Sequence, residues 1–352
     1  MSNRTLAEVV RQLESGNPPA ENAGFLGADL NPAEARLVLV PVPWDATTSY
    51  RPGTARGPNA IIGASHQLDL EDDAFGRPYR HGIAFLPETP GISELNALAR
   101  PAAERAIAAI EVGTDSPRDV AQVNEASAEV MRWVRSAARK HLDAGQCVAL
   151  VGGDHSSPFG LIEALAEVER GGFGLLQIDA HHDFRRAYEG FTWSHASIAF
   201  NVMERLGDAV TRLVQVGIRD YSREEAEYLA SLGERGRCFR DRDLFRARAE
   251  GASFADLTLR ILEGLPERVH VTFDIDGLEP QYCPSTGTPV PGGLSYNEAG
   301  YLIEALVRSG RKIVGFDLCE VAPGPDGMEW DANVGARLLY RLCGALLACP
   351  AR

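Results

Sequence analysis

The stretch Phe173-Gly174-Leu175-Leu176-Gln177-Ile178-Asp179-Ala180-His181-His182-Asp183 joins a mostly apolar run to two carboxylates and two imidazoles. The apolar half is short and predicts a buried strand. In an extended chain, side chains two positions apart share a face, so Asp179, His181 and Asp183 converge while Ala180 and His182 point away. Crowding these groups is costly unless a cation neutralises them. The stretch therefore predicts a metal site at the end of a buried strand.

Similar apolar runs recur along the chain and alternate with helical patterns. The runs cover 37–42, 148–151, 173–178, 213–217, 269–273 and 313–316, and the helical patterns include 130–141, 159–169, 224–232, 256–265 and 297–308. This alternation is typical of a parallel sheet covered by helices on both faces. We therefore expect an α/β protein with three α/β/α layers and a central, mostly parallel sheet.

Polar residues gather where these runs end. They are Trp44-Asp45, Gly153-Asp154-His155, Asp274-Ile275-Asp276, and Asp317 with Glu320. The carboxyl ends of parallel strands meet at one rim, so we expect a single site there. Taken alone, a D-x-D pair is also a common turn or helix cap, and a histidine after Gly152-Gly153 is often a loop residue. Together with Asp179 to Asp183, they favour ligand roles.

Charge arithmetic predicts two ions. The six ligand candidates carry four negative charges, which balance two divalent cations; they are His155, Asp179, His181, Asp183, Asp274 and Asp276. Oxygen and imidazole ligands without thiolate suit manganese, nickel or cobalt better than structural zinc. Two such ions sharing one water lower its pKa toward neutrality, which predicts a hydrolytic nucleophile.

The bulk composition narrows the function classes. The chain has 352 residues, is 45% hydrophobic and carries a formal charge of −14. This charge argues against nucleic acid and favours cationic substrates and metal ions. The six scattered cysteines form no C-x-x-C pair, so they predict reduced thiols. The polar N-terminus and the lack of an apolar run near ~20 residues predict a soluble cytoplasmic protein without membrane contact.

Two segments are expected. Residues 1–34 form an N-terminal arm with a short amphipathic helix over 5–13 and a loop at 16–19, and residues 35–352 form one domain. The arm packs on the main domain or on a neighbouring subunit, or it is a frayed tail.

The ordered motifs resemble the ureohydrolase superfamily of arginase, agmatinase and related guanidino hydrolases. The resemblance covers roughly residues 35–345 and rests on Gly152-Gly153-Asp154-His155-Ser156, Asp179-Ala180-His181-His182-Asp183, Ser194-His195, Phe273-Asp274-Ile275-Asp276, Gly287-Thr288-Pro289 with Gly292-Gly293, and Asp317-Leu318-Cys319-Glu320-Val321. It implies a sheet of about eight strands and assembly as trimers or hexamers, with or without a paralogous subunit.

The resemblance also implies the role of each site residue. One ion would be held by His155, Asp179, Asp183 and Asp274, and the other by Asp179, His181, Asp274 and Asp276. His195 matches the proton-shuttling histidine, and Glu320 matches the carboxylate that binds the guanidinium. Asp183 is also expected to be a catalytic residue. The implied reaction is attack of a metal-bridging hydroxide on the guanidinium carbon, with release of urea.

Departures from better-known members indicate the substrate. Agmatinases usually carry Ser-His-Gly at the shuttle, whereas this chain has Ser194-His195-Ala196-Ser197. A cation at Arg185 would repel the distal ammonium of agmatine, unless that side chain is solvated. The segments around Thr47, Trp193 and Trp330 resemble a subgroup that includes nickel-dependent guanidine hydrolases and biguanide hydrolases.

These departures predict a compact substrate. Trp193 and Trp330 would close a small pocket over a cation, although each tryptophan is equally explained by core packing. We therefore expect free guanidine, an alkylguanidine or a biguanide, with Ni²⁺ or Mn²⁺, ahead of agmatine or a guanidino acid. Glu279-Pro280 replaces the usual Asp-Pro after the second D-x-D pair.

Two other readings compete with this one. A deacetylase or amide hydrolase on a related fold would typically bind one zinc and would not need all six ligand positions. A catalytically silent partner subunit would keep the scaffold but lose ligands, and none of the six is lost here.

Overall fold

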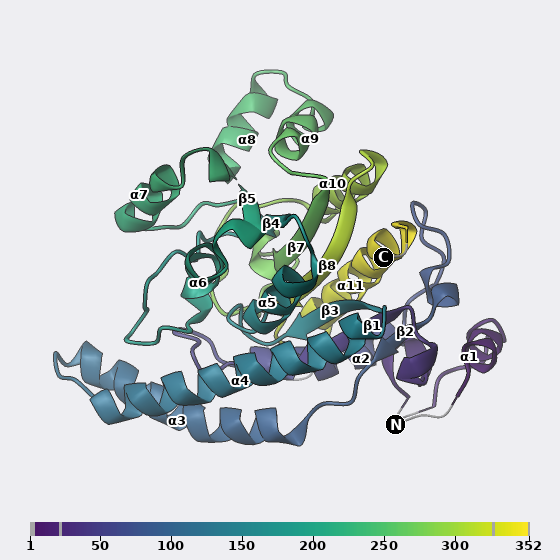
Figure 1. The fold of residues 1–352 in the computed structure, drawn as a ribbon, viewed down its shortest axis with the longest axis horizontal. Coiled ribbons are helices and arrows are strands. Elements are labelled where there is room, and N and C mark those ends of the chain that lie inside the picture. Colours follow the sequence, from purple (N-terminus) through teal and green to yellow (C-terminus); the bar gives the residue numbers. More distant parts are fainter. Residues whose placement is uncertain (1–3, 21–22, 326–327, 351–352) are drawn as a thin grey trace.

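Eight parallel strands form the centre of the computed structural model, which describes residues 4–20, 23–325 and 328–350 (Figure 1). Their order across the sheet is β2-β1-β3-β8-β7-β4-β5-β6. The strands are β1 (Leu37–Val42), β2 (Ile83–Phe85), β3 (Cys147–Gly152), β4 (Phe173–Ile178), β5 (Val210–Val216), β6 (Gly236–Phe239), β7 (Arg268–Asp274) and β8 (Lys312–Cys319). The predicted α/β class is confirmed.

The six apolar runs each lie on a strand, whereas the two edge strands were missed. β2 has only three residues, and two of them are half-buried. In β6, Arg237 is exposed and its neighbours are half-buried. A short edge strand contacts one neighbour only, so its sequence lacks the continuous apolar run that identifies a central parallel strand.

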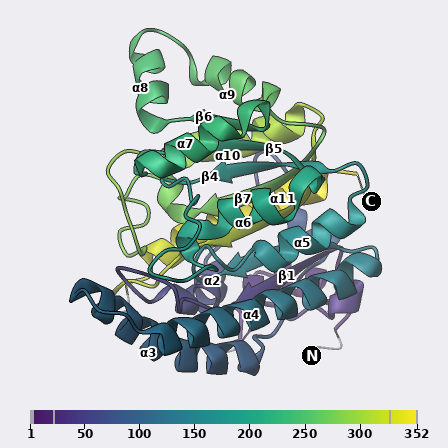
Figure 2. The same ribbon diagram turned by 60° about the vertical axis from the view of Figure 1, so that its left-hand side comes forward.

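Helices cover both faces of the sheet (Figures 1 and 2). Strand side chains alternate between the two cores: in β3, Ala149 and Val151 face one, while Val148 and Leu150 face the other. The first core includes residues of α2 (Gly57–Ser65), α8 (Asp241–Ala249), α9 (Phe254–Glu263), α10 (Tyr296–Arg308) and α11 (Trp330–Ala348). The second includes residues of α3 (Pro90–Glu111), α4 (Pro117–Asp143), α5 (Phe159–Val168), α6 (Ile198–Arg205) and α7 (Arg223–Ser231). The three predicted layers are therefore present.

The long pair α3 and α4 lies along one side of the molecule (Figure 2). Small residues of α3, namely Ala102, Ala103 and Ala106, pack with Val123 of α4 and Phe191 in a separate cluster. Helix α4 extends well beyond the predicted 130–141, because its first half packs against α3 rather than against the sheet.

The described part of the N-terminal arm contains α1 (Leu6–Leu13), which Thr5 and Glu8 cap reciprocally. Val9 of this helix is buried in a small cluster with Val38 of β1 and Ala84 of β2. Residues 1–3 and 21–22 of the predicted arm lie outside the described residues. None of the helices described here is long and apolar enough to cross a bilayer.

The four central strands, β3, β8, β7 and β4, carry the polar residues at their carboxyl ends. Close backbone packing brings the loop after β3 into place, because the Trp44 carbonyl accepts the Asp154 amide at 2.7 Å. A Cβ added at Gly153 would lie only 2.1 Å from that same oxygen. Glycine at this position therefore lets the chain reach the rim.

We expect Gly153→Ala to destabilise the fold by at least about 1–3 kcal/mol, because backbone has to move to admit the methyl group. The matched control is Gly63→Ala in α2, where a Cβ meets no atom within 4 Å. That change should leave stability equal or raise it by up to about 1 kcal/mol. Urea unfolding of both variants measures the difference, and equal midpoints would contradict the packing argument.

Candidate metal centre

Three strand ends deliver the six predicted ligands to one place. His155 follows β3, Asp274 is the last residue of β7 and Asp276 lies two residues further on. The segment after β4 supplies the rest, namely Asp179, His181 and Asp183. All six are buried except His181, which is half-buried.

The first group of ligands surrounds the Nδ1 atom of His155. This nitrogen lies 3.1 Å from both Asp179 Oδ2 and Asp183 Oδ2, and 3.4 Å from Asp274 Oδ2. The atom is buried and has no hydrogen-bond partner. An unpaired buried nitrogen among three carboxylates is the arrangement expected of a metal ligand.

The second group surrounds Nδ1 of His181. It lies 3.2 Å from Asp276 Oδ2 and 3.6 Å from Asp179 Oδ1. Asp179 therefore belongs to both groups and offers one oxygen to each. Two overlapping sets that share a carboxylate fit two neighbouring divalent ions, with oxygen and imidazole donors throughout.

Electrostatics within the cluster also fit cations. Burial, together with the charge of Asp179, raises the pKa of Asp183 to about 7. Burial and the Asp276 carboxylate raise the pKa of Asp274 well above its usual range. Although burial lowers it, the nearby carboxylates raise the pKa of His155 well above its usual value. The cluster thus attracts protons strongly, and metal ions would displace them.

A supporting layer holds His155 from its other ring nitrogen. Nε2 lies 2.8 Å from Thr272 Oγ1, whose hydroxyl donates to Asp317 Oδ1 at 2.8 Å. The second Asp317 oxygen lies 2.7 Å from His270 Nε2. Since the Thr272 proton goes to Asp317, His155 Nε2 donates to Thr272, and Nδ1 keeps its lone pair for the cluster.

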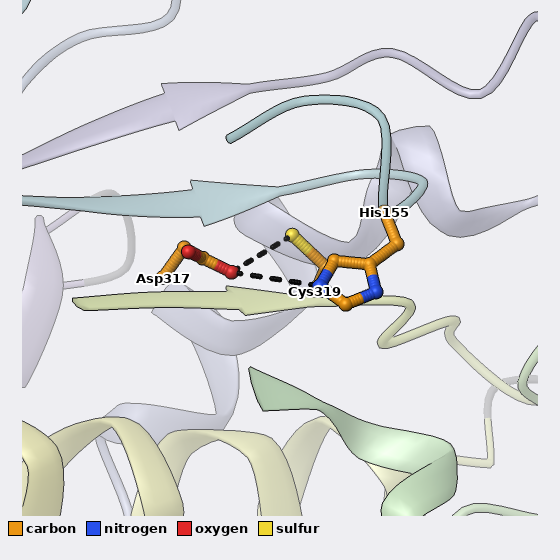
Figure 3. A group of neighbouring side chains, drawn as sticks. All are labelled: His155, Asp317 and Cys319. Atoms are coloured by element: carbon orange, nitrogen blue, oxygen red, sulfur yellow. Dashed lines mark hydrogen bonds and ion pairs between the residues drawn. The ribbon is translucent and has the colours of Figure 1, made fainter. Parts of the chain in front are cut away.

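Figure 3 shows His155, Asp317 and Cys319, whose donor atoms also lie close enough to hold a cation. Both Asp317 oxygens already accept hydrogen bonds, and burial raises the pKa of the Cys319 thiol well above its usual value. A protonated thiol is a poor ligand. We therefore assign this group to the support of His155.

His195 faces the cluster through one defined nitrogen. Its Nδ1 lies 2.9 Å from the Thr47 carbonyl, which only accepts, so Nδ1 carries the proton. The other nitrogen, Nε2, lies 3.4 Å from Ser49 Oγ, and both His195 and Ser49 line the cavity. Burial and the neighbouring His181 lower the pKa of His195 to about 4, so the neutral ring is the dominant form at pH 7.

Thr47 is a support for His195 and not part of the cavity lining. Its hydroxyl accepts the His195 amide at 3.1 Å and donates to Asp154 Oδ2 at 2.8 Å. Asp154 is fully buried, and burial raises its pKa to about 6. The polar residues Asp154 and Asp45 are thus internal anchors; Asp45 accepts the amides of Gly53 and Ala55.

Glu320 lines the cavity beside the cluster. Its Oε1 accepts the His155 amide at 2.9 Å, while its buried Oε2 has no partner. Burial and the carboxyl of Asp154 raise the pKa of Glu320 well above its usual range. Glu320 and Asp183 both have left-handed backbones, with φ of 64° and 56°. Non-glycine residues adopt this strained conformation where their neighbours hold it in place, which is common in binding sites.

A cavity of about 570 Å³ opens over these groups. Its lining includes His155, His181, Asp183, Asp274, His195 and Glu320, and its outer part includes Tyr50, Arg51, Arg185, Tyr188, Asp220 and Tyr221. Of these outer residues, the sequence identified only Arg185. Asp220 and Tyr221 follow β5, so the rule that ligands lie beyond strand ends would have identified them.

The two tryptophans do not line this cavity. Trp193 packs edge-on against Phe159 and under the guanidinium of Arg205, and the exposed Trp330 donates its indole N–H to the Gln281 carbonyl. Arg185 does line the cavity, but its Nε lies 3.2 Å from Glu225 Oε2. This ion pair offsets much of the repulsion that the sequence predicted. The Glu279 carboxylate accepts a hydrogen bond from the Gln281 side-chain amide at 2.7 Å.

We expect His181→Ala to remove one of the two bound ions and His182→Ala to leave both in place. His181 faces the cluster, whereas the buried His182 points away and bonds Gln215 at 2.6 Å. Elemental analysis of the metal-loaded variants, after removal of free ions, measures the stoichiometry. Equal losses in the two variants would show that the faces of this segment are wrongly assigned.

Comparisons with known proteins agree with this geometry. A family model described as "Arginase family" matches residues 35–344. The N(1)-aminopropylagmatine ureohydrolase of Thermus thermophilus is 35% identical, over 88% of this chain and 90% of the relative. The proclavaminate amidinohydrolase of Streptomyces clavuligerus is 30% identical, over 90% and 91%.

A solved structure has the same architecture. The agmatine ureohydrolase of Thermoplasma volcanium superposes with a TM-score of 0.72 at 25% identity, covering 96% of this chain and 98% of the other. The family match, the relatives and this fold lead to one conclusion. The chain belongs to the arginase family, whose members are hydrolases that act on the C–N bonds of guanidino compounds.

Proposed function

We propose that this chain binds two divalent ions, Mn²⁺ or Ni²⁺, and hydrolyses a guanidino compound to urea and an amine or ammonia. The observation that carries the proposal is the shared cavity. Residues of both overlapping Asp/His groups, His155 and Asp274 from one and His181 from the other, line the same cavity as Glu320, whose Oε2 is unpaired. Such a cavity brings together a place for ions and a place for a planar cation.

The ligand set assigned to the ions is the one expected from the sequence. One ion would be held by His155, Asp183 and Asp274. The other would be held by His181, Asp274 and Asp276. Asp179 would bind both ions. Bound ions would supply Lewis acidity, which lowers the pKa of water enough for attack on carbon near neutral pH. The chain itself supplies four carboxylates, so the loaded centre is near neutral and tolerates burial.

Glu320 binds the substrate in this proposal. Its Oε1 is fixed by the His155 amide, and its free Oε2 is available to a guanidinium N–H. A buried carboxylate with a raised pKa gains stability when a cation arrives beside it. Glu320 thereby places the guanidinium carbon next to the two metal-binding groups.

His195 moves the proton. Its Nε2 lone pair reaches the cavity while Nδ1–H stays bonded to the Thr47 carbonyl. Nε2 takes a proton released from the attacking water and returns it to the departing nitrogen, so the amine leaves in a protonated form. Asp183, which lies in the same lining, completes the catalytic residues of the proposal.

The first substrate candidates are compact: free guanidine, an alkylguanidine or a biguanide. Arg51 in the outer lining supports them because it disfavours a distal ammonium group, whereas Glu225 offsets much of the charge of Arg185. Tyr50, Tyr188 and Tyr221 also line the cavity, and each ring already has an arginine guanidinium of the chain over it.

The second candidates are longer and carry a distal amine. The cavity of about 570 Å³ is much larger than a guanidinium, and Asp220 in its lining offers negative charge to an amine, whereas Glu225 already pairs with Arg185. Relatives named N(1)-aminopropylagmatine ureohydrolase and agmatinase also favour this class. Because two arginines and two acids face each other in the outer cavity, charge alone does not choose between the classes.

Beyond the site, we propose a cytoplasmic protein that assembles as a trimer or hexamer, with or without a paralogous subunit. Residues 1–34 would act as the arm of a single domain formed by 35–352. Light scattering of the purified protein measures the assembly, and a monomer at working concentration would contradict it.

A urea-release screen tests the proposed function. We expect release from guanidine, methylguanidine or a biguanide to exceed release from agmatine, aminopropylagmatine and guanidinobutyrate, with Mn²⁺ or Ni²⁺ and not after chelation. Glu320→Gln should mainly raise KM, because it keeps the shape but loses the charge that captures the cation. Failure to release urea from any compound by protein carrying two ions would overturn the proposal, whereas a preference for the amines would select the longer class.

The role of Thr47 gives a separate prediction. Thr47→Val removes the hydroxyl that orients His195 and satisfies Asp154, so we expect kcat to fall about ten- to hundredfold with little change in KM. Thr47→Ser retains the hydroxyl and should restore most of the rate. Steady-state kinetics of both variants measure this, and a Thr47→Val enzyme with normal kcat would refute the support of His195.

A further inference from the structure

Two buried glutamines lie behind the metal centre on neighbouring strands. Gln177 of β4 and Gln215 of β5 are paired in register, and both side chains are inaccessible to solvent. Amides buried this deeply are costly unless their hydrogen bonds are satisfied. Their partners are each other, the ring and carbonyl of His182, the carbonyl of His181, and the carboxylate of Asp179.

The hydrogen bonds of these residues run in one direction. His182 Nδ1 lies 2.6 Å from Gln215 Oε1, which only accepts, so the imidazole donates. Gln215 Nε2 donates to Gln177 Oε1 at 2.8 Å, and Gln177 Nε2 donates to Asp179 Oδ2 at 2.8 Å. Each amide orientation is fixed by the previous one, starting from a ring that stacks on Phe184.

The end of this series is the shared ligand. Asp179 Oδ2 faces His155 in one group, and Asp179 Oδ1 faces His181 in the other. Oδ1 also accepts the His181 amide at 2.7 Å. The N–H from Gln177 and this amide fix the rotation of the carboxylate, so that one lone-pair direction on each oxygen points into the cluster.

We propose that Gln177, supported by Gln215 and His182, is a positioning residue that orients Asp179 and thereby sets the affinity of the centre for its ions. This inference rests on the metal centre of the proposed function. Neutral donors suit the task, because they stabilise the buried carboxylate without adding a positive charge that would oppose the cations. The proposal also assigns a role to His182, whose side chain points away from the ions.

The test compares ion affinity in Gln177→Met with that of the unchanged chain. Methionine has similar length but cannot donate, so the carboxylate loses its outer partner. Equilibrium dialysis of the full chain against Mn²⁺ or Ni²⁺, with elemental analysis, measures the dissociation constant. We expect it to rise about 10- to 100-fold, the usual effect of removing a group that orients a metal ligand.

Gln146→Met is the matched control. Gln146 also uses its amide fully, donating to the carbonyls of Pro32 and Ala35 and meeting His141, but it lies beside the opposite end of β3. Its loss should lower the unfolding midpoint of the ion-free protein without changing ion affinity. An equal loss of affinity in Gln146→Met would overturn the proposal, since general destabilisation would then explain both variants.

Substitutions at Gln215 and His182 leave the hydrogen bond from Gln177 to Asp179 in place. Gln215→Met and His182→Phe should each weaken ion binding by less than tenfold, and Gln215→Met should add little once Gln177 is already Met. If Gln177→Met does not fold, these two variants carry the test. Unchanged affinity in all folded variants, with two ions in the unchanged chain, would overturn this inference alone; no ions in the unchanged chain would overturn the proposed function itself.

Discussion

Buried negative charge is the constraint on which this structure depends. Four aspartates and Glu320 lie at one rim of the sheet with almost no access to water. An ionised carboxylate in such a position is unfavourable in free energy. The pKa values of Asp183 and Asp274 are raised for this reason, so both groups bind protons strongly. Bound divalent cations would remove this cost, which favours the proposed two-ion centre.

The fold meets this constraint with hydrogen-bond partners on the outer side of three site residues, His155, Asp179 and Glu320. Thr272 and Asp317 hold His155, Gln177 holds Asp179, and the His155 amide holds Glu320. Most of these partners come from the same central strands as the ligands, because parallel strands bring successive side chains into register at the sheet edge. In the proposed centre, a group that orients a metal-binding side chain acts on the chemistry without touching a substrate.

The outer cavity is built differently from the acidic rim. Its lining comes from loops after β1, β4, β5 and β7, and arginines, tyrosines and acids alternate there without one dominant charge. Loops of this kind vary freely while the scaffold stays the same, so the reaction class is set by the rim and the substrate by the loops. This division explains why family membership fixes guanidino chemistry but leaves the choice between compact and amine-bearing substrates to experiment.

The sequence by itself determined the parallel sheet, its six principal strands and the six ligand candidates, because apolar runs and period-two spacing are local properties. It missed β2 and β6, whose short edge sequences carry little pattern, and it left open whether Trp193 and Trp330 close a pocket or pack in the core. Neither tryptophan lines the cavity. Only the tertiary structure decided that Thr47 accepts the His195 amide and that Glu225 pairs with Arg185. It also decided that Gln177 and Gln215 support Asp179. Those contacts join residues from different strands and loops, and no spacing along the chain encodes which side chains meet.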